Sequence, residues 1–355
     1  MTSEASPPVI DPVLSENIID SHPAPDSSSE KVETLQKLSP QSASFLTSFW
    51  KFTRPHTIYG TTASVLSLYL LALPFGILWI EHWLSLAIAL LACLGMNIYI
   101  VGLNQLTDIE IDRINKPHLP LAAGSLTPHQ GWRIILFCGI LALFASSWQR
   151  PYLLATVVSS GLIGTAYSLP PLRLKRFPLA AAACIYLVRG LIVNLGLYQA
   201  FRQIAQLPIG IPPQLIALTL FMSIFGVAIA IFKDIPDMEG DRQFQIATFS
   251  LRWGQAKVLN ASVAILSLAY AGMILFSFFG FLPIQKGCLS LICFLSEGGI
   301  WFLILHGLGL VVLLAMRLTV QIECRQTIVN YYQLIWKLFY LEYLFYPLTM
   351  ISMIS

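Results

Sequence analysis

Two short acidic stretches stand out in this chain of 355 residues, because acids are rare elsewhere in its apolar part. Eleven acidic residues follow residue 44, and seven of them fall within residues 108–112 and 234–241. The side chains at helical spacing are Asn104, Asp108 and Asp112 in the first stretch and Asp234, Asp237 and Asp241 in the second. Residues four apart share one face of a helix, so each stretch would present a row of polar side chains to one side.

Carboxylates stacked in this way predict a magnesium site. They repel one another and are poorly solvated at the end of a membrane helix, so they call for a counter-cation. Oxygen ligands without His or Cys favour Mg2+, which keeps waters and completes its shell with substrate phosphates. Two clusters on separate helices suit a diphosphate held by more than one metal ion. We predict that all six side chains are metal ligands, and that the catalytic residues are Asp108, Asp112, Asp237 and Asp241. The alternative, that these are solvated acids capping helices, would not explain the paired spacing.

Basic residues near the acidic stretches and at neighbouring segment ends are predicted to bind the diphosphate. The order of the apolar segments places them on the same side of the membrane as the acids, where they can converge on phosphate oxygens. They are Arg54, Lys116, Lys175, Arg176, Lys233 and Arg242. Each of them taken alone is also compatible with an anchor at the membrane interface.

Arg189 is different, because the run from Tyr186 to Asn194 places it inside an apolar segment. A charge at that depth is expensive and usually functional. We predict that Arg189 contacts a phosphate or a substrate carboxylate, and an ion pair with a motif aspartate is the alternative. Tyr167, which opens the loop carrying Lys175, is predicted to contact the substrate too.

The elements that position these residues are membrane helices. Hydrophobic residues make up 56% of the chain and charged residues 11%, with a mean hydropathy of +0.71. An ordinary soluble domain has about 25% charged residues, so this composition predicts an all-α, polytopic membrane protein with no nucleic-acid partner. The predicted spans are Ile58–Ile80, Trp83–Leu103, Gln130–Trp148, Tyr152–Leu169, Pro178–Ala200, Gln214–Phe232, Lys257–Gly280, Gly287–Met316 and Val329–Met350.

Residues 1–44 differ in composition from the rest of the chain. They are rich in Ser and Pro, carry seven acids, and match neither a signal peptide nor a transit peptide, so we predict a disordered tail before a membrane domain at 45–355. The lack of a transit-peptide pattern favours a bacterial or cyanobacterial protein, in a plasma or thylakoid membrane.

The loops between the predicted spans can be numbered in chain order, and basic residues gather in the even-numbered ones. The positive-inside rule places these loops in the cytoplasm, together with both acidic stretches. The stretches are four predicted spans apart, which is compatible with an internal duplication or with coincidence.

The pattern N-x-x-x-D-x-x-x-D, followed by a second D-x-x-x-D on another helix, resembles the UbiA superfamily of membrane prenyltransferases. Longer strings are similar to its homogentisate prenyltransferase branch. They are Arg54-Pro-His-Thr-Ile, Asn104 to Asp108, Asn115 to Gly124, Val188-Arg-Gly, Val193-Asn-Leu-Gly, Lys233 to Arg242, Thr248 to Gly254 and Trp336-Lys-Leu-Phe-Tyr340. The resemblance runs from about residue 45 to the end, and it implies a nine-helix bundle around a central cavity.

The resemblance also implies the reaction. Magnesium would be held by the motif residues, the diphosphate would meet Arg54, Lys175 and Arg176, and the diphosphate would leave an allylic carbocation for homogentisate to attack. The branch couples this step with loss of the acetate carboxyl as carbon dioxide, in tocopherol and prenylquinone biosynthesis. Phytyl diphosphate is the first choice of donor and geranylgeranyl or solanesyl diphosphate the alternative. The open alternatives are another UbiA-type aromatic prenyltransferase, a chlorophyll synthase and, more distantly, a secondary transporter.

Overall fold

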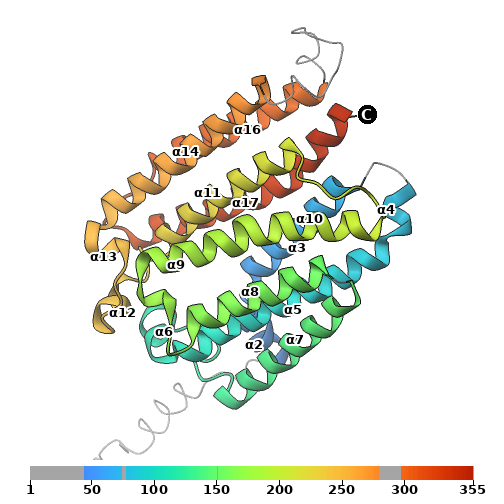
Figure 1. Ribbon diagram of the computed structural model, residues 1–355. Helices are drawn as coiled ribbons and strands as arrows, with labels where there is room; N and C mark the ends of the chain where they lie inside the picture. Colours follow the sequence, from blue (N-terminus) through green and yellow to red (C-terminus); the bar gives the residue numbers. More distant parts are fainter. Residues whose placement is uncertain (1–43, 74–76, 150, 280–296, 355) are drawn as a thin grey trace, which may run out of the picture. The chain divides into compact units, whose positions relative to one another are not determined.

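The computed structural model describes residues 44–73, 77–149, 151–279 and 297–354, and all the regular structure in these ranges is helical (Figure 1). The helices are α2 (Phe45–Phe52), α3 (Pro55–Ala72), α4 (Ile77–Glu81), α5 (Trp83–Thr107), α6 (Ile109–Asn115), α7 (Pro128–Trp148), α8 (Tyr152–Ser168), η1 (Leu174–Arg176), α9 (Pro178–Ile185), η2 (Tyr186–Ile192), α10 (Val193–Ile204), α11 (Pro213–Phe232), α12 (Met238–Gln243), α13 (Phe249–Trp253), α14 (Gln255–Phe279), α16 (Glu297–Arg317) and α17 (Arg325–Ile354). The all-α prediction is confirmed for this part of the chain.

Six of these helical segments are long and apolar enough to cross a membrane, judged by length and composition alone. They are α5, α7, the continuous run from α9 to α10, α11, α14 and α16. Every predicted span overlaps a described helix, but nine membrane crossings stay a prediction because the remaining helices do not pass this test. The helix of the first predicted span, α3, ends at Ala72, short of the predicted Ile80. The predicted start of the eighth span, like the tail up to residue 43, lies outside the described residues.

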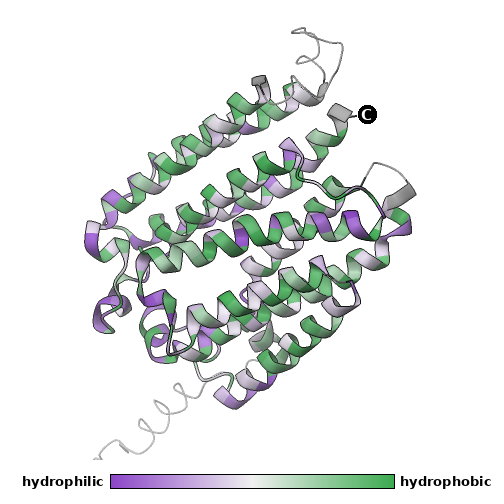
Figure 2. Cartoon of the chain, in the orientation of Figure 1, coloured by the Kyte–Doolittle hydropathy of each residue, from purple (hydrophilic) through white to green (hydrophobic). Residues whose placement is uncertain are grey.

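The helices pack side by side, with α11 at the centre of the apolar core. Neighbours in space include α5 with α7, α11 with α14 and α17, and α3 with both α10 and α17. The rings of Phe221, Phe225 and Phe232 on α11 are fully buried in that core. Apolar side chains therefore line both the interior and the outer surface, as expected where the surroundings are lipid (Figure 2).

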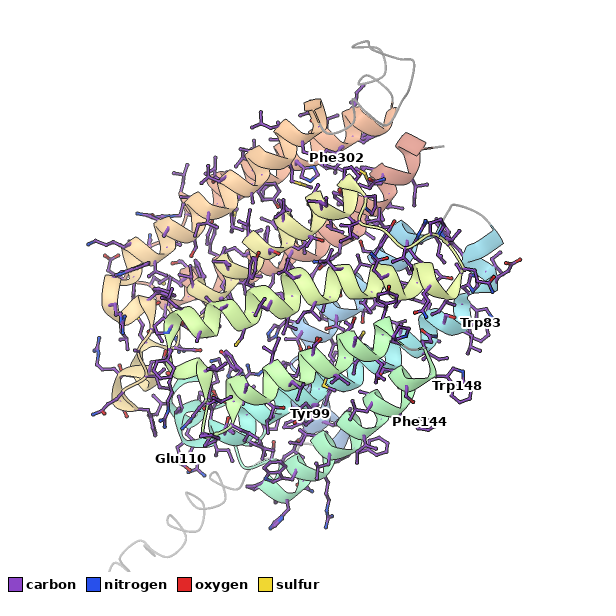
Figure 3. All side chains as sticks on the ribbon, viewed as in Figure 1. Trp83, Tyr99, Glu110, Phe144, Trp148 and Phe302 are labelled. Carbon is purple, nitrogen blue, oxygen red and sulfur yellow. The ribbon has the colours of Figure 1, made fainter. Side chains whose placement is uncertain are left out.

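The two ends of the bundle differ in chemistry. Hydrophilic residues gather at the end that carries α6, α12 and α13 (Figure 2). Glu110 lies at that end, whereas Trp83 and Trp148 lie toward the other (Figure 3). Both tryptophans are exposed, at 63% and 75% of their surface. Tryptophan is enriched where a membrane meets water, so their positions are typical of an interfacial belt.

Candidate functional site

The two acidic stretches have the same local build. Each follows a long helix, α5 or α11, and each ends in a short helix, α6 or α12. The helix is not continuous through the first stretch, because α5 ends at Thr107 and Asp108 interrupts it. The Asp112 amide still donates to the Asp108 carbonyl at 2.7 Å, and the Asp241 amide donates to the Asp237 carbonyl at 3.1 Å. The last acid of each stretch is thus one hydrogen-bonded turn beyond the acid before it.

The two stretches meet in space although 121 residues separate Lys116 from Asp237, with which it forms a salt bridge. Asn115, which is buried, accepts a hydrogen bond from the Gly240 amide through its Oδ1 atom at 2.8 Å. A Cβ atom at Gly240 would lie 2.7 Å from that same side chain, so only glycine allows this approach. Arg325 also links the two stretches, because it donates hydrogen bonds to the carbonyl of Asn115 and to that of Pro236. We call the contacts of Lys116 with Asp237 and of Asn115 with Gly240 the joint between the motifs, and infer that it fixes the distance between the two acidic motifs.

Asp108 is the most heavily paired acid of the first motif. Its Oδ1 atom lies 2.7 Å from Lys175 Nζ and 3.3 Å from an Arg173 amino group. Asn104 donates to the other carboxylate oxygen at 3.2 Å. Lys175 and Arg173 also donate to the side chain and the carbonyl of Thr107, respectively. The loop after α8 therefore brings two cations onto one motif aspartate.

Arg173 was not predicted as a site residue, whereas Arg176, which was, is exposed. The difference comes from the loop backbone: Arg173 adopts a left-handed conformation at φ 37°, and the single turn of η1 follows it. This geometry turns Arg173 and Lys175 inward and leaves Arg176 outside. Arg242 on α12 is exposed as well, and its role, like that of Arg176, stays a prediction. Arg173 and Lys175, the two inward side chains, are two residues apart, and this spacing is the one feature of the sequence that could have pointed to Arg173.

Arg54 and Arg173 share two unusual features. Arg54 also has a left-handed backbone, at φ 52°, just before α3. That conformation is strained for a residue other than glycine and is concentrated at functional sites. The Nε atom of each arginine is buried and has no hydrogen-bond partner within the described residues. Two buried donors of this kind suit an anion with several oxygens, because a bound diphosphate would satisfy both.

Two further aspartates are buried beside a cation. Asp112 lies 3.8 Å from an Arg54 amino group, and Asp234 pairs with Lys233 at 2.5 Å. Burial raises the pKa of both carboxyl groups above the ordinary value, although the adjacent cations act in the opposite direction. The neutral forms of the Asp112 and Asp234 carboxyl groups are therefore favoured more than they are in water, unless a further cation binds beside them.

Asp241 is buried without a partner. Only 7% of its surface is exposed, and its carboxylate makes no salt bridge or hydrogen bond to any other described residue. Burial, together with the charges of Asp234 and Asp237, raises its pKa to about 7. An unpaired buried carboxylate is unfavourable, and a cation bound at Asp241 would relieve it.

Magnesium fits these donors only with help from other ligands. Among the described residues, no three acid, His or Cys side chains lie close enough to enclose a metal by themselves. The oxygen-only chemistry of the motifs nevertheless matches a hard cation that takes one or two carboxylates and finds its remaining ligands in waters and substrate phosphates. The unpartnered Asp241 and the buried Nε donors are consistent with such a shared complex.

A cavity of about 260 Å3 opens beside the acidic motifs and extends between α3, α5, α8, η2, α11 and α17. Its polar end is lined by Arg54, Asn104, Tyr167 and Lys233, which are all predicted site residues. Its remaining wall is mainly apolar. Tyr167, at the end of α8, lies on the cavity wall with the diphosphate-binding candidates Arg54 and Lys233, and its contact with the substrate stays a prediction.

Arg189 also lines this cavity, away from the motif acids. It sits on η2, a π-helical turn, and its guanidinium carbon lies 5.1 Å from the centre of the Trp336 ring. No salt bridge joins it to a motif aspartate in the ranges the structure describes, so the buried ion pair that was the alternative is not found. The proximity of Trp336, on the last helix, could not be foreseen from a sequence position so far away.

Comparison with known proteins places these features in context. The profile of the UbiA prenyltransferase family matches residues 59–338. The homogentisate phytyltransferase of Synechocystis sp. is 46% identical over 310 residues, covering 85% of this chain and 95% of that protein. The homogentisate geranylgeranyltransferase of Hordeum vulgare is 38% identical over 85% of this chain and 72% of its own length. Among solved structures, a UbiA homologue from Archaeoglobus fulgidus bound to GPP and Mg2+ aligns with a TM-score of 0.55 and 16% identity, over 86% of this chain and 99% of that one, which shows a common fold.

Proposed function

The chain belongs to the UbiA prenyltransferase family, and we propose that it transfers a prenyl group from an allylic diphosphate to homogentisate. The acceptor is supported by relatives named for homogentisate, which cover most of this chain at 46% and 38% identity. Phytyl diphosphate is the proposed donor because the Synechocystis relative is named a phytyltransferase. Geranylgeranyl diphosphate is the second candidate, since the barley relative is named for that tail.

We propose that the motif side chains bind Mg2+ together with the diphosphate. The metal ligands would be Asn104, Asp108, Asp112, Asp234, Asp237 and Asp241. A bound Mg2+ would supply positive charge to the departing diphosphate. The observation that carries the proposal is that the two motifs meet, through Lys116 with Asp237 and Asn115 with Gly240. Asn104 and Lys233, which belong to the same two stretches, line the apolar cavity.

The chain's own cations have a defined task in this reaction. Lys175, Arg173 and Lys116 form salt bridges with motif aspartates. If Mg2+ were bound at those aspartates, the same cations would be available to the phosphate oxygens. They then stabilise the charge that develops as the allylic C–O bond breaks, and the buried Nε donors of Arg54 and Arg173 act in the same way.

The apolar wall of the cavity keeps water from the prenyl cation, so that the electron-rich ring attacks it instead. The C–O bond to diphosphate breaks first, the ring then forms a C–C bond to the allylic cation, and the attacked ring carbon releases a proton. The branch reaction also cleaves the bond between the acetate methylene and its carboxyl, which leaves as carbon dioxide, and the methylene takes up one proton. The products are diphosphate, carbon dioxide and a prenylated methylquinol.

We further propose that the acidic end faces the cytoplasm, in a cyanobacterial plasma or thylakoid membrane. The excess of basic residues in the even-numbered loops supports this orientation. Arg176 and Arg242, which are exposed at these loops, would then serve as interfacial anchors if they do not bind diphosphate.

The test is mass spectrometry of the products formed by detergent-purified protein with Mg2+. Homogentisate would be offered with phytyl, geranylgeranyl and solanesyl diphosphates, and 4-hydroxybenzoate and chlorophyllide would be offered as rival acceptors. We expect a prenylated methylquinol that requires both homogentisate and Mg2+. Products from 4-hydroxybenzoate or chlorophyllide with none from homogentisate would instead support the other family activities.

A further inference from the structure

Arg189 is a cation within a membrane-spanning run that no described carboxylate neutralises. Its side chain lies over the Trp336 ring, with the centroid 5.1 Å from the guanidinium carbon. The titratable groups that face it are Tyr332, Tyr340 and Tyr343 on α17, and His56 on α3. None of these carries a negative charge at neutral pH.

Such a placement is unfavourable unless it serves a ligand. Moving an arginine to the middle of a membrane helix is unfavourable. A contact with an aromatic ring recovers only part of that cost. The remaining compensation has to come from outside the chain, and an anion that enters the cavity would provide it.

The local backbone is built to hold Arg189 in this position. Residues Tyr186–Ile192 form a π-helical turn, a feature that is frequent at functional sites. Asn194 donates to the carbonyls of Arg189 and Gly190 at 3.2 and 2.6 Å, and its Oδ1 atom accepts from the Tyr343 hydroxyl at 2.9 Å. Gly190 packs against α11 so closely that a Cβ atom would lie 2.2 Å from Ser223 Oγ.

The ion pairs of the site separate Arg189 from the motif acids. Arg54, Lys116 and Lys233 form salt bridges with Asp112, Asp237 and Asp234, and no salt bridge within the described ranges joins Arg189 to an acid. The donor's charged group therefore has its own cations at the polar end. Of the two substrates under the proposed function, the other anionic group is the carboxylate of homogentisate.

We propose that Arg189 binds the carboxylate of an arylacetate acceptor, with Asn194 and Tyr343 as positioning residues that fix the π-helical turn. This assignment rests on the proposed function and defines the acceptor class more narrowly. The carboxylate pairs with the guanidinium while the aromatic ring of the acceptor lies among the side chains of Trp336 and the α17 tyrosines. The chain then selects arylacetates over neutral phenols of the same shape.

The experiment compares a charged ligand with its neutral isostere. Binding of 4-hydroxyphenylacetate and of 4-hydroxyphenylacetamide to purified protein in detergent would be measured by calorimetry, for the wild type and for Arg189→Gln. Because a hydrogen-bonded charge pair contributes about 1.5–3 kcal/mol, we expect the variant to weaken binding of the acid roughly 10–100-fold. Binding of the amide should change by less than about threefold, so the preference for the acid should largely disappear.

Steady-state kinetics provide the second readout. In Arg189→Gln, the KM for homogentisate should rise while the KM for the prenyl diphosphate stays the same, and Arg189→Lys should restore part of the loss. An increase in the donor KM, or an equal loss of affinity for acid and amide, would overturn the assignment. Arg202→Gln, at the far end of α10, is the matched control, and both ligands should bind to it as to the wild type.

Tyr343→Phe keeps the test decisive if Arg189→Gln does not fold. It removes a single hydroxyl and frees Asn194, so we expect a smaller loss of affinity, about fivefold, for the acid alone. Equal effects of Tyr343→Phe on the two ligands would overturn the positioning role. A wild-type protein that prefers the acid but forms no product from homogentisate would contradict the proposed function while leaving the carboxylate site in place.

Discussion

The two charged regions of the cavity are compensated in opposite ways. At the acidic end most motif aspartates already lie beside a cation of the chain, and Asp241 alone is buried without one. Further along the cavity, Arg189 has an aromatic face but no acid. The first region can therefore exchange its internal partners for a metal and a diphosphate, whereas the second can only be completed by an anion from outside. One region is suited to a reaction, and the other to recognition.

The largest effect should follow from removing an acid. Asp108→Asn or Asp241→Asn should lower kcat about 10³-fold, because charge stabilisation at a leaving group is among the largest catalytic contributions. Product formation at saturating substrates measures this. Glu110→Gln is the matched control, since Glu110 lies beside the motif but is exposed and pairs with Arg113, and it should stay within about twofold of the wild type. Normal turnover in Asp241→Asn would show that this carboxylate holds no metal.

Substitutions of the three basic residues in the loop after α8 compare the two inward side chains with the outward one. Lys175→Met and Arg173→Met should each reduce kcat about 10²-fold, since each removes a donor to the diphosphate. Arg176→Met should have little effect, because that side chain is exposed. The three variants would be compared under the same conditions with phytyl diphosphate. If Arg176→Met were the most damaging, the loop geometry would be wrong for the bound state.

The joint between the motifs can be disturbed without touching a charge. Gly240→Ala would place a Cβ atom 2.7 Å from the Asn115 side chain and displace the hydrogen bond that links the motifs. We expect a loss of activity of about tenfold and a lower melting temperature, since a buried hydrogen bond is lost. Gly272→Ala, on α14 where nothing lies within 4 Å, is the control and should be neutral or slightly stabilising.

The smallest predicted effect is on the magnesium requirement. Asp241 has its pKa raised to about 7, so it is increasingly protonated as the pH falls through that value, and Mg2+ must then compete with a proton. The Mg2+ concentration at half-maximal rate should rise about threefold between pH of about 7.5 and about 6.5, as the ionised fraction falls. Rates would be plotted against free Mg2+, after correction for its binding to the diphosphate in the same buffers. A requirement independent of pH would contradict the raised pKa.

Much of the fold was readable from the sequence because lipid imposes simple rules. Apolar runs between polar breaks located the helices, and the largest error at an end that the structure describes is that of α3, which ends at Ala72 and not at Ile80. The ends of α5, α10 and α17 differ from the predicted ones by four residues. The π-helical turn at Arg189 was not foreseen, since it depends on Asn194 and on contacts with Tyr343 and Ser223 from other helices.

The candidate site was predicted as far as residue type and spacing allow. Lys175 pairs with Asp108 and the two motifs meet through Lys116 and Asp237, as expected where a membrane helix tolerates few acids elsewhere. The metal-binding role of these acids stays a prediction. Arg173 was missed, since the direction of a side chain in a loop depends on a left-handed backbone that the sequence does not reveal. Trp336 was missed as a partner of Arg189 because the two are joined only by the packing of η2 and α17 around the cavity.

The most direct test of the central claim is an experimental structure with a non-cleavable thio-analogue of the prenyl diphosphate and Mn2+ in place of Mg2+. The anomalous signal of the metal would locate it without assumptions about its ligands. The account predicts metal and diphosphate between α6 and α12, with at least one aspartate from each motif bound to the metal. A metal held by one motif only, or a diphosphate elsewhere in the cavity with both motifs still paired to their own lysines and arginines, would contradict it.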